Sequence, residues 1–309
     1  MKNISEFEKL FKLNFPVREN YEYYIDTLMK SPFYAGLGKL VEEFEKYEKD
    51  IEEEGLFKSP TSYKLDYALP KLKSYIMSTK AYIGFISDKL DNSKLRTKDE
   101  LRNNDNTYLI SIDFKSANYN AIKTYDNDGE LFDSWEELCM ALDIHPTLSK
   151  SKSFRQYVFG NTSPGRLTKI QHVNIIKIID KLIESKCFVE EDFVFISHDE
   201  FIVRLRPDHK LSVNRIHLLN SEVGRIISEE GISMPTHYNV FKLETLGKGK
   251  YIKTHYNVKM GGLSEKYTSL VGVPSNMFYL YFKKYIIEEE LDDRDLLFIV
   301  DKKLAKWVI

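Results

Sequence analysis

Cysteine is scarce in this sequence, and glycine and proline are also few. The 309 residues include only Cys139 and Cys187, whose spacing fits neither a structural zinc site nor a disulfide framework. We therefore expect a reducing, cytoplasmic setting. Fourteen glycines and nine prolines, with 42% hydrophobic and 30% charged residues, exclude a fibrous or disordered chain and indicate an ordered globular protein.

Long apolar runs are missing as well. No segment approaches the roughly 20 apolar residues that cross a bilayer, and residues 1–7 lack the apolar core of a secretion signal. We expect a protein that neither spans a membrane nor is secreted. The chain is long enough for one large domain, or for one domain with smaller flanking parts.

Charge is distributed unevenly, although the formal net charge of −2 excludes a protein that coats nucleic acid through overall positive charge. Residues 144–179 and 245–264 contain no acidic residue. Such segregation suits a local phosphate-binding surface, but the solvated faces of ordinary helices would give the same pattern. The basic residues of the two stretches are Lys150, Lys152, Arg155, Arg166, Lys169, Lys177, Lys248, Lys250, Lys253 and Lys259.

The hydrophobic pattern changes along the chain. The first hundred residues predict amphipathic helices, at 6–13, 21–29, 37–51 and 71–90. Strand and helix patterns then alternate and end with a predicted helix at 213–230 and a strand at 238–243. We predict a helical N-terminal domain, an α+β domain and a C-terminal extension, over residues 1–104, 105–250 and 251–309.

Two predicted strands carry carboxylates at their tips, at Asp113 after Tyr-Leu-Ile-Ser-Ile and within His198-Asp199-Glu200 after Phe-Val-Phe-Ile-Ser. Two carboxylates about 4 Å apart repel by roughly 4 kcal/mol at an effective dielectric of 20, so a shared cation would stabilise them. Mg²⁺ prefers such hard oxygen ligands, supplemented by substrate phosphates and water.

We predict Asp113 and Asp199 as ligands of two Mg²⁺ or Mn²⁺ ions. Alternation along a strand turns Glu200 away from Asp199, which predicts a peripheral place for Glu200. In the plainer alternative, Asp113 merely ends a strand and residues 198–200 form a polar turn.

Five segments between Asp105 and Gly249 follow one another in an order that resembles the palm of family A DNA polymerases, the DNA polymerase I type. The single-subunit phage RNA polymerases are more distantly similar. Ile112–Asn118 looks like motif A, Arg155–Gly160 like motif B, and His198–Glu200 like the His-Asp-Glu of motif C. The helix around Gln171–Lys177 and the ending Ile232–Pro235, a strand and Gly247 look like further family segments.

The resemblance implies an antiparallel, polymerase-like palm sheet flanked by helices, with an N-terminal part that is thumb-like or accessory. Asp113 and Asp199 would hold the two metal ions together with the backbone carbonyl of Phe114, and Glu200 would complete the catalytic group. Arg155 stands where the family has a phosphate-binding lysine. The incoming nucleotide would contact Lys152, Arg155, Phe159 and Asn118, and the primer or template would contact Gln171, His198 and Arg166.

Departures from the family pattern matter as much as the matches. Asn118 replaces the glutamate that crowds the ribose 2′-hydroxyl, so the choice between DNA and RNA stays open. Ser163 takes the place of a tyrosine, and only 11 residues separate Phe159 from Gln171, where the family inserts most of its fingers subdomain. Such an economical chain suits a virus- or phage-encoded enzyme acting in a host cell.

The expected function is that of a metal-dependent nucleotidyltransferase, a minimal polymerase that extends a 3′-hydroxyl during replication. It would use nucleoside triphosphates and a primer or primer–template, and a protein subunit could supply the missing fingers or thumb. One alternative is a non-catalytic palm that binds nucleic acid or a replication partner. Another is an unrelated metal-dependent phosphohydrolase.

Overall fold

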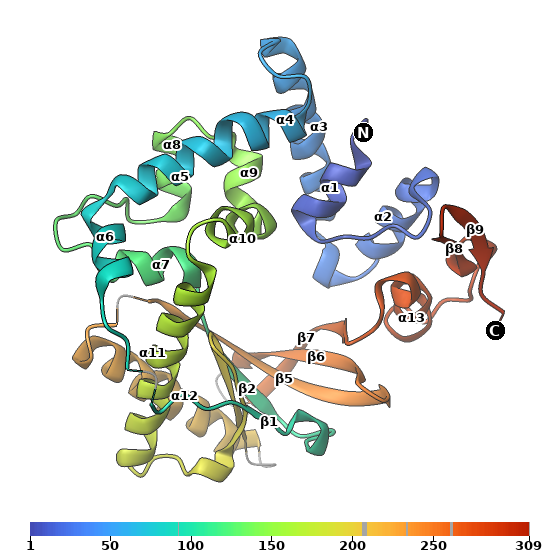
Figure 1. The fold of residues 1–309 in the computed structure, drawn as a ribbon. Coiled ribbons are helices and arrows are strands. Elements are labelled where there is room, and N and C mark those ends of the chain that lie inside the picture. Colours follow the sequence, from blue (N-terminus) through green and yellow to red (C-terminus); the bar gives the residue numbers. More distant parts are fainter. Residues whose placement is uncertain (92, 206–208, 233, 260–261, 309) are drawn as a thin grey trace.

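A computed structural model describes residues 1–91, 93–205, 209–232, 234–259 and 262–308. Its N-terminal third is helical, as the amphipathic pattern predicts (Figure 1). Within the described ranges, no helix combines the length and the apolarity needed to cross a membrane. The N-terminal helices are α1 (Ile4–Phe11), η1 (Arg18–Asn20), α2 (Tyr21–Met29), η2 (Pro32–Tyr34), α3 (Leu37–Glu54), α4 (Pro60–Ser62), η3 (Tyr63–Ala68), α5 (Leu69–Ser78) and α6 (Lys80–Ser87).

A seven-stranded sheet, in which every neighbouring pair is antiparallel, forms the centre of the molecule. This confirms the predicted α+β class with an antiparallel sheet. In spatial order its strands are β1 (Lys98–Asp99), β3 (Phe193–Ile196), β4 (Glu200–Arg204), β2 (Leu109–Phe114), β5 (Thr236–Gly247), β6 (Lys250–Lys259) and β7 (Gly262–Val271). A separate hairpin consists of β8 (Leu297–Val300) and β9 (Lys303–Lys306).

Further helices follow residue 100. They are η4 (Leu101–Asn103), α7 (Ala117–Lys123), α8 (Trp135–Ala141), α9 (Pro146–Lys150), α10 (Lys152–Gly160), α11 (Pro164–Glu184), η5 (Glu190–Asp192), α12 (His209–Glu229), η6 (Ser275–Met277), α13 (Phe278–Tyr285) and η7 (Asp293–Leu296). Two of them, α10 and α11, line the cavity described below. Ser151 caps α10 by accepting a hydrogen bond from the Phe154 N–H at 3.1 Å. After a connection of three residues, Pro164 begins α11 at a position in the first turn where a proline costs no hydrogen bond.

The two faces of the sheet carry different side chains, because alternate residues of a strand point to opposite faces. Ile110, Ile112 and Phe114 of β2 belong to the large hydrophobic core that α11 and α12 share. Leu109 lies on the other face, within a small apolar cluster. The remaining buried members of that cluster are Val194, Ile202, Phe241 and Leu243. We call the face with Leu109, Ser111 and Asp113 the site face.

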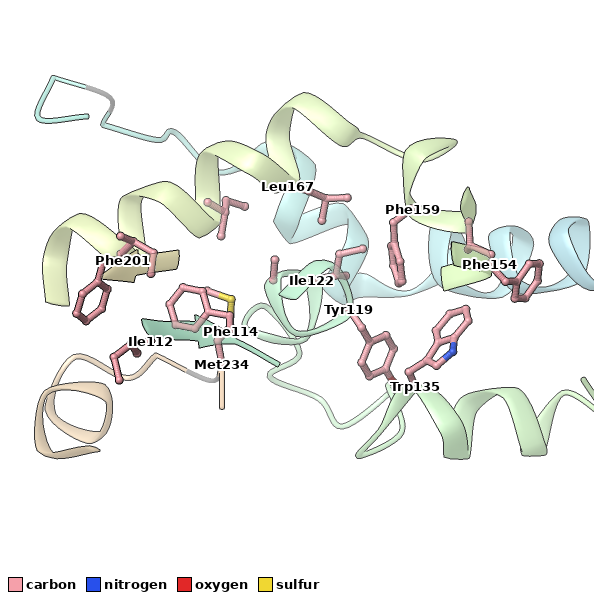
Figure 2. Packing of buried hydrophobic residues seen from close by; sticks show 14 of the residues in the cluster. Ile112, Phe114, Tyr119, Ile122, Trp135, Phe154, Phe159, Leu167, Phe201 and Met234 are labelled. Atoms are coloured by element: carbon pink, nitrogen blue, oxygen red, sulfur yellow. The ribbon is translucent and has the colours of Figure 1, made fainter. Parts of the chain in front are cut away.

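The large core is continuous across the chain. Figure 2 shows one part of it, where Phe114 and Met234 lie near the sheet and Trp135 packs beside Phe159. The same cluster includes Phe7 of α1 and Phe282 of α13. It therefore contains residues of all three parts predicted from the sequence, and the division of the chain into domains stays a prediction.

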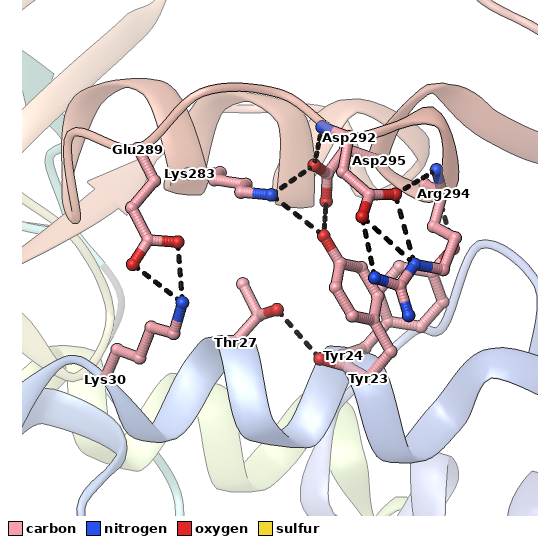
Figure 3. Close-up of polar contacts among 9 residues, drawn as sticks. All are labelled: Tyr23, Tyr24, Thr27, Lys30, Lys283, Glu289, Asp292, Arg294 and Asp295. Carbon is pink, nitrogen blue, oxygen red and sulfur yellow. Dashed lines mark hydrogen bonds and ion pairs between the residues drawn. The ribbon is translucent and has the colours of Figure 1, made fainter.

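Buried hydrogen bonds around an ion pair connect residues 283–295 to α2 (Figure 3). Lys283 of α13 lies 2.8 Å from a carboxylate oxygen of Asp295, with side-chain exposures of 8% and 0%. Tyr23 donates a hydrogen bond to Asp295 at 2.7 Å and accepts one from Lys283 at 3.0 Å. Tyr24 donates to the carbonyl of Arg294 at 3.0 Å. The buried side chains of Lys283, Asp295 and Tyr24 thus each have a polar partner, as burial requires.

Candidate active site

Backbone hydrogen bonding brings the two predicted aspartate tips together. Asp113 is the fifth residue of β2, and Asp199 lies in the turn between β3 and β4. The N–H of Phe114 donates to the carbonyl oxygen of Asp199 at 3.1 Å. Asp113 and Asp199 both line one cavity of about 580 Å³.

Five parts of the fold form this cavity. Residues 113–118, at the end of β2 and directly after it, form one part, α10 contributes Lys152 and Arg155, and α11 contributes Gln171. The hairpin tip contributes His198 together with Asp199, and β5 contributes His237. The cavity thus lies where the end of the central strand meets α10 and the beginning of α11.

The carboxylates near the cavity are electrostatically strained without a cation. Burial raises the pKa of Asp113, and the charge of Asp199 raises it further, while His237 and Lys152 act in the opposite direction. Burial also raises the pKa of Glu200, although the hydrogen bond from Ser111 partly offsets this. A divalent ion would stabilise the ionised form of such carboxylates.

The strand-alternation argument does not apply to Glu200. Strand β4 begins at Glu200, so Asp199 lies in the turn and alternation does not relate the two side chains. The register pairs Glu200 directly with Asp113, and residues paired in this way share a face. Ser111 Oγ donates to Glu200 Oε1 at 2.5 Å. Glu200 is therefore on the site face, close to Asp113 but outside the cavity lining.

Three predicted nucleotide contacts lie on α10. Lys152, Arg155 and Phe159 are spaced by three and four residues, which puts them on one side of the helix, and all three line the cavity. Burial lowers the pKa of Arg155, and its guanidinium lies 3.9 Å from the Glu136 carboxylate. Arginine remains charged in such a setting.

The Phe159 ring is fully buried, with its centroid 5.6 Å from that of Trp135. A buried core aromatic fits this placement better than a ring that lies freely against a nucleotide, although Phe159 contributes atoms to the cavity wall. Its burial positions α10 and so the two cations on the same helix.

Gln171 and Asn118 are directly joined. Gln171 Nε2 donates to Asn118 Oδ1 at 2.8 Å, and both residues line the cavity. Gln171 is only 2% exposed. From the sequence we predict that Gln171 contacts the primer end and that Asn118 contacts the nucleotide sugar. The hydrogen bond between them means that both side chains belong to the same wall of the cavity.

His198 and Arg166 have contrasting environments. His198 is exposed at the hairpin tip, with Nε2 3.4 Å from Asp199 Oδ1. Arg166 instead donates hydrogen bonds to the backbone carbonyls of Phe85 and Asp88 and does not line the cavity. The predicted residues that the cavity brings together are Asp113, Phe114, Asn118, Lys152, Arg155, Phe159, Gln171, His198 and Asp199.

The positions of His237 and Lys253 beside the site were not predicted, although Lys253 belongs to one of the basic stretches. His237 pairs with Asp113 across β2 and β5, and its only local signal was its position just after Pro235 at the start of a strand. Lys253 of β6 interacts electrostatically with Glu200 and Asp113. Nothing near Lys253 in the sequence predicts that its strand joins this sheet.

The donor set fits a magnesium site that depends on its substrate. Among the described residues, no group of three or more His, Cys, Asp and Glu side chains is arranged to hold a metal ion. Mg²⁺ commonly binds one or two carboxylates and takes its other ligands from substrate phosphates and water. Asp113 and Asp199 supply that number of carboxylates, and Lys152 and Arg155 offer positive charge to a phosphate in the same cavity.

Comparisons with known proteins add no family assignment to this geometry. No model of a protein family matches the chain, and no curated protein sequence matches it either.

Proposed function

We propose that this protein is a metal-dependent nucleotidyltransferase that extends a 3′-hydroxyl with nucleoside triphosphates, in the manner of a minimal family A-like DNA or RNA polymerase. The observation that carries the proposal is the joint lining of one cavity by Asp113, Asp199 and the two cations Lys152 and Arg155. Carboxylates for divalent ions and cations for phosphates are the two requirements of this chemistry.

Each residue has a defined role in the proposed reaction. Two divalent ions bound at Asp113 and Asp199 would lower the pKa of the attacking hydroxyl and stabilise the leaving oxygen. Arg155 would bind triphosphate oxygens in a bidentate manner, and Lys152 would add a second positive charge. Gln171, held by Asn118, would orient the primer end or the sugar. Catalysis would then come mainly from positioning and charge stabilisation.

The connection between α10 and α11 limits how the nucleotide can be enclosed. Only Asn161–Ser163 join the two helices, and Ser163 Oγ lies 3.3 Å from the Tyr82 hydroxyl. A segment this short has no room for a moving fingers subdomain. The enzyme would extend a primer slowly, add nucleotides without a template, or use a protein partner that supplies the missing part.

A direct test is incubation with labelled primer–template, Mg²⁺ or Mn²⁺, and each deoxyribonucleotide or ribonucleotide. We expect metal-dependent extension that Asp113→Asn and Asp199→Asn each abolish. Asp66→Asn serves as the control, because Asp66 is exposed on η3. Extension that persists in either active-site variant would rule out the assigned site.

The short α10–α11 connection also favours a second candidate, a non-catalytic palm-like protein that binds nucleic acid or a replication partner. The two candidates differ in their response to metal. If Asp113 and Asp199 bind a metal ion, added Mn²⁺ should raise the melting temperature of the protein, and nucleotide should raise it further. Ligands that bind the folded state stabilise it. A non-catalytic protein should melt at the same temperature with and without the metal.

A further inference from the structure

Lys253 lies on β6 and projects onto the site face of the sheet. Its neighbours across the ladder are Leu243 of β5 and Ser269 of β7, and Leu243 belongs to the small apolar cluster of that face. The ammonium nitrogen of Lys253 lies 3.9 Å from the ring centroid of Phe241. Because Phe241 is two residues closer than Leu243 to the part of β5 beside Asp113, the side chain leans toward the site.

The ammonium group of Lys253 has unused hydrogen-bonding capacity. No hydrogen bond or ion pair joins it to any residue that the structure describes. A lysine ammonium has three donors, and a contact with an aromatic face uses none of them. Burial lowers the pKa of Lys253, and the charges of Glu200 and Asp113 oppose this effect only in part. The group is thus a partly desolvated cation whose donors meet no protein acceptor among the described residues.

We propose that Lys253 binds a backbone phosphate of the nucleic-acid strand whose 3′ end lies at Asp113. This assignment rests on the proposed function and extends it to a strand of the sheet beyond residue 250, outside the region of family resemblance. A phosphate supplies the acceptors that the ammonium lacks. The aromatic face of Phe241 holds the cation on the site face, where a strand leaving the site along the sheet would pass.

The register also sets how far this phosphate lies from the 3′ end. Phe241 pairs with Leu109, four residues before Asp113 on β2. At about 3.3 Å per residue along a strand, Leu109 and Asp113 are about 13 Å apart. Phosphates of one strand follow one another at about 3.4 Å along a duplex. The phosphate bound by Lys253 therefore lies within about four nucleotides of the 3′ end.

Binding of fluorescent primer–template, measured by anisotropy without nucleotide over a series of salt concentrations, tests the assignment. We expect Lys253→Met to weaken binding several-fold and to reduce the slope of log K against log salt by about 0.7 to 0.9, the loss of one phosphate contact. Lys253→Arg should restore both. The matched control is Lys242→Met, since Lys242 has a similar contact, 4.0 Å from the Tyr108 ring centroid, on the opposite face.

A neutral methylphosphonate placed at each linkage in turn from the 3′ end locates the contact. One linkage within about four nucleotides of the end should weaken binding of the wild type but not of the Lys253→Met variant. If Lys253→Met leaves the affinity and the salt slope unchanged, Lys253 only neutralises Glu200 and Asp113, and the assignment is wrong. Lys253→Gln replaces the methionine variant if that variant melts below the assay temperature.

These binding measurements separate the assignment from the proposed function. A wild-type protein that binds with the expected salt slope but never extends a primer would overturn the reaction and leave the Lys253 contact standing. If the wild type extends a primer but Lys253→Met binds it as tightly as the wild type does, the Lys253 contact would be wrong and the reaction would stand.

Discussion

The backbone N–H of Phe114 donates a hydrogen bond to the carbonyl oxygen of Asp199, 3.1 Å away. This bond attaches the end of β2 to the tip of the β3–β4 hairpin. It continues the ladder between β2 and β4, in which Asp113 pairs with Glu200. The backbone therefore fixes the positions of both aspartates, whose side chains line the same cavity.

Replacing either aspartate by asparagine should remove activity without unfolding the protein. Since burial raises the pKa of Asp113, its ionised form is disfavoured in the folded state, and Asp113→Asn should melt at a higher temperature than the metal-free wild type. Nucleotide incorporation should fall by about 10²-fold or more, the effect of losing one group that stabilises a transition state. Calorimetry and incorporation assays on one preparation check both effects. A lower melting temperature would contradict this account of Asp113.

Arg155→Lys should weaken nucleotide binding while the fold is kept. A lysine retains the charge but cannot form the bidentate contact of a guanidinium, and a charged hydrogen bond contributes about 1.5 to 3 kcal/mol. The Kd for a nucleoside triphosphate with Mg²⁺ should therefore rise by about 10-fold or more. Lys169→Met is the control, because Lys169 is exposed on α11 and does not line the cavity. Equal Kd values for Arg155→Lys and wild type would remove Arg155 from the site.

His255 should make the fold sensitive to mild acid. It is 6% exposed, its ring nitrogens lie 3.0 Å from Asn239 Oδ1 and 3.2 Å from Ser269 Oγ, and burial lowers its pKa to about 4. Because the unfolded chain binds a proton near pH 6.5 and the folded chain does not, stability falls as pH drops from 6.5 toward 4. The loss is at most about 3 kcal/mol.

Urea unfolding between pH 7 and pH 4 measures this effect. In His255→Asn the part of the pH dependence that comes from His255 should be absent. The same substitution at His217, which is exposed on α12, should leave the pH dependence intact. Identical pH profiles for wild type and His255→Asn would show that His255 is protonated equally in the folded and unfolded states.

The buried Lys283–Asp295 pair should contribute far more to stability than a similar exposed pair in the same segment. Asp295→Asn leaves the Lys283 charge buried without its counterion, which typically costs about 3 to 5 kcal/mol. Lys306 and Asp293 are also 2.8 Å apart, but their side chains are 51% and 85% exposed. Asp293→Asn should change the unfolding free energy by less than about 1 kcal/mol. Similar effects of the two variants in urea titrations would contradict the role assigned to the buried ion pair.

Local patterns predicted the parts of the fold whose signals are strong. The apolar runs that precede Asp113 and Asp199 form strands whose residues are mostly buried, as their pattern predicts. Strands β6 and β7 gave no such signal, since most of their side chains are only half-buried and alternation is weak. Hence the sequence did not predict that residues after 250 widen the sheet.

In the site, too, relations within one helix follow from the local sequence, whereas contacts between strands do not. Lys152 and Arg155 lie three residues apart on α10 and both line the cavity, a relation that depends only on local helix geometry. The pairing of His237 with Asp113 and the approach of Lys253 depend on strand register, which no short segment encodes. The orientation of Glu200 depended on where β4 begins, a boundary that alternation alone does not define.

The measurement that tests the central claim most directly is the number of Mn²⁺ ions bound in the presence of a non-hydrolysable nucleoside triphosphate, determined by electron paramagnetic resonance. We expect two bound ions in the wild type, and the loss of at least one in Asp113→Asn and in Asp199→Asn. Binding that is undetectable in the wild type, or unchanged when both aspartates are replaced, would contradict a shared metal site at Asp113 and Asp199.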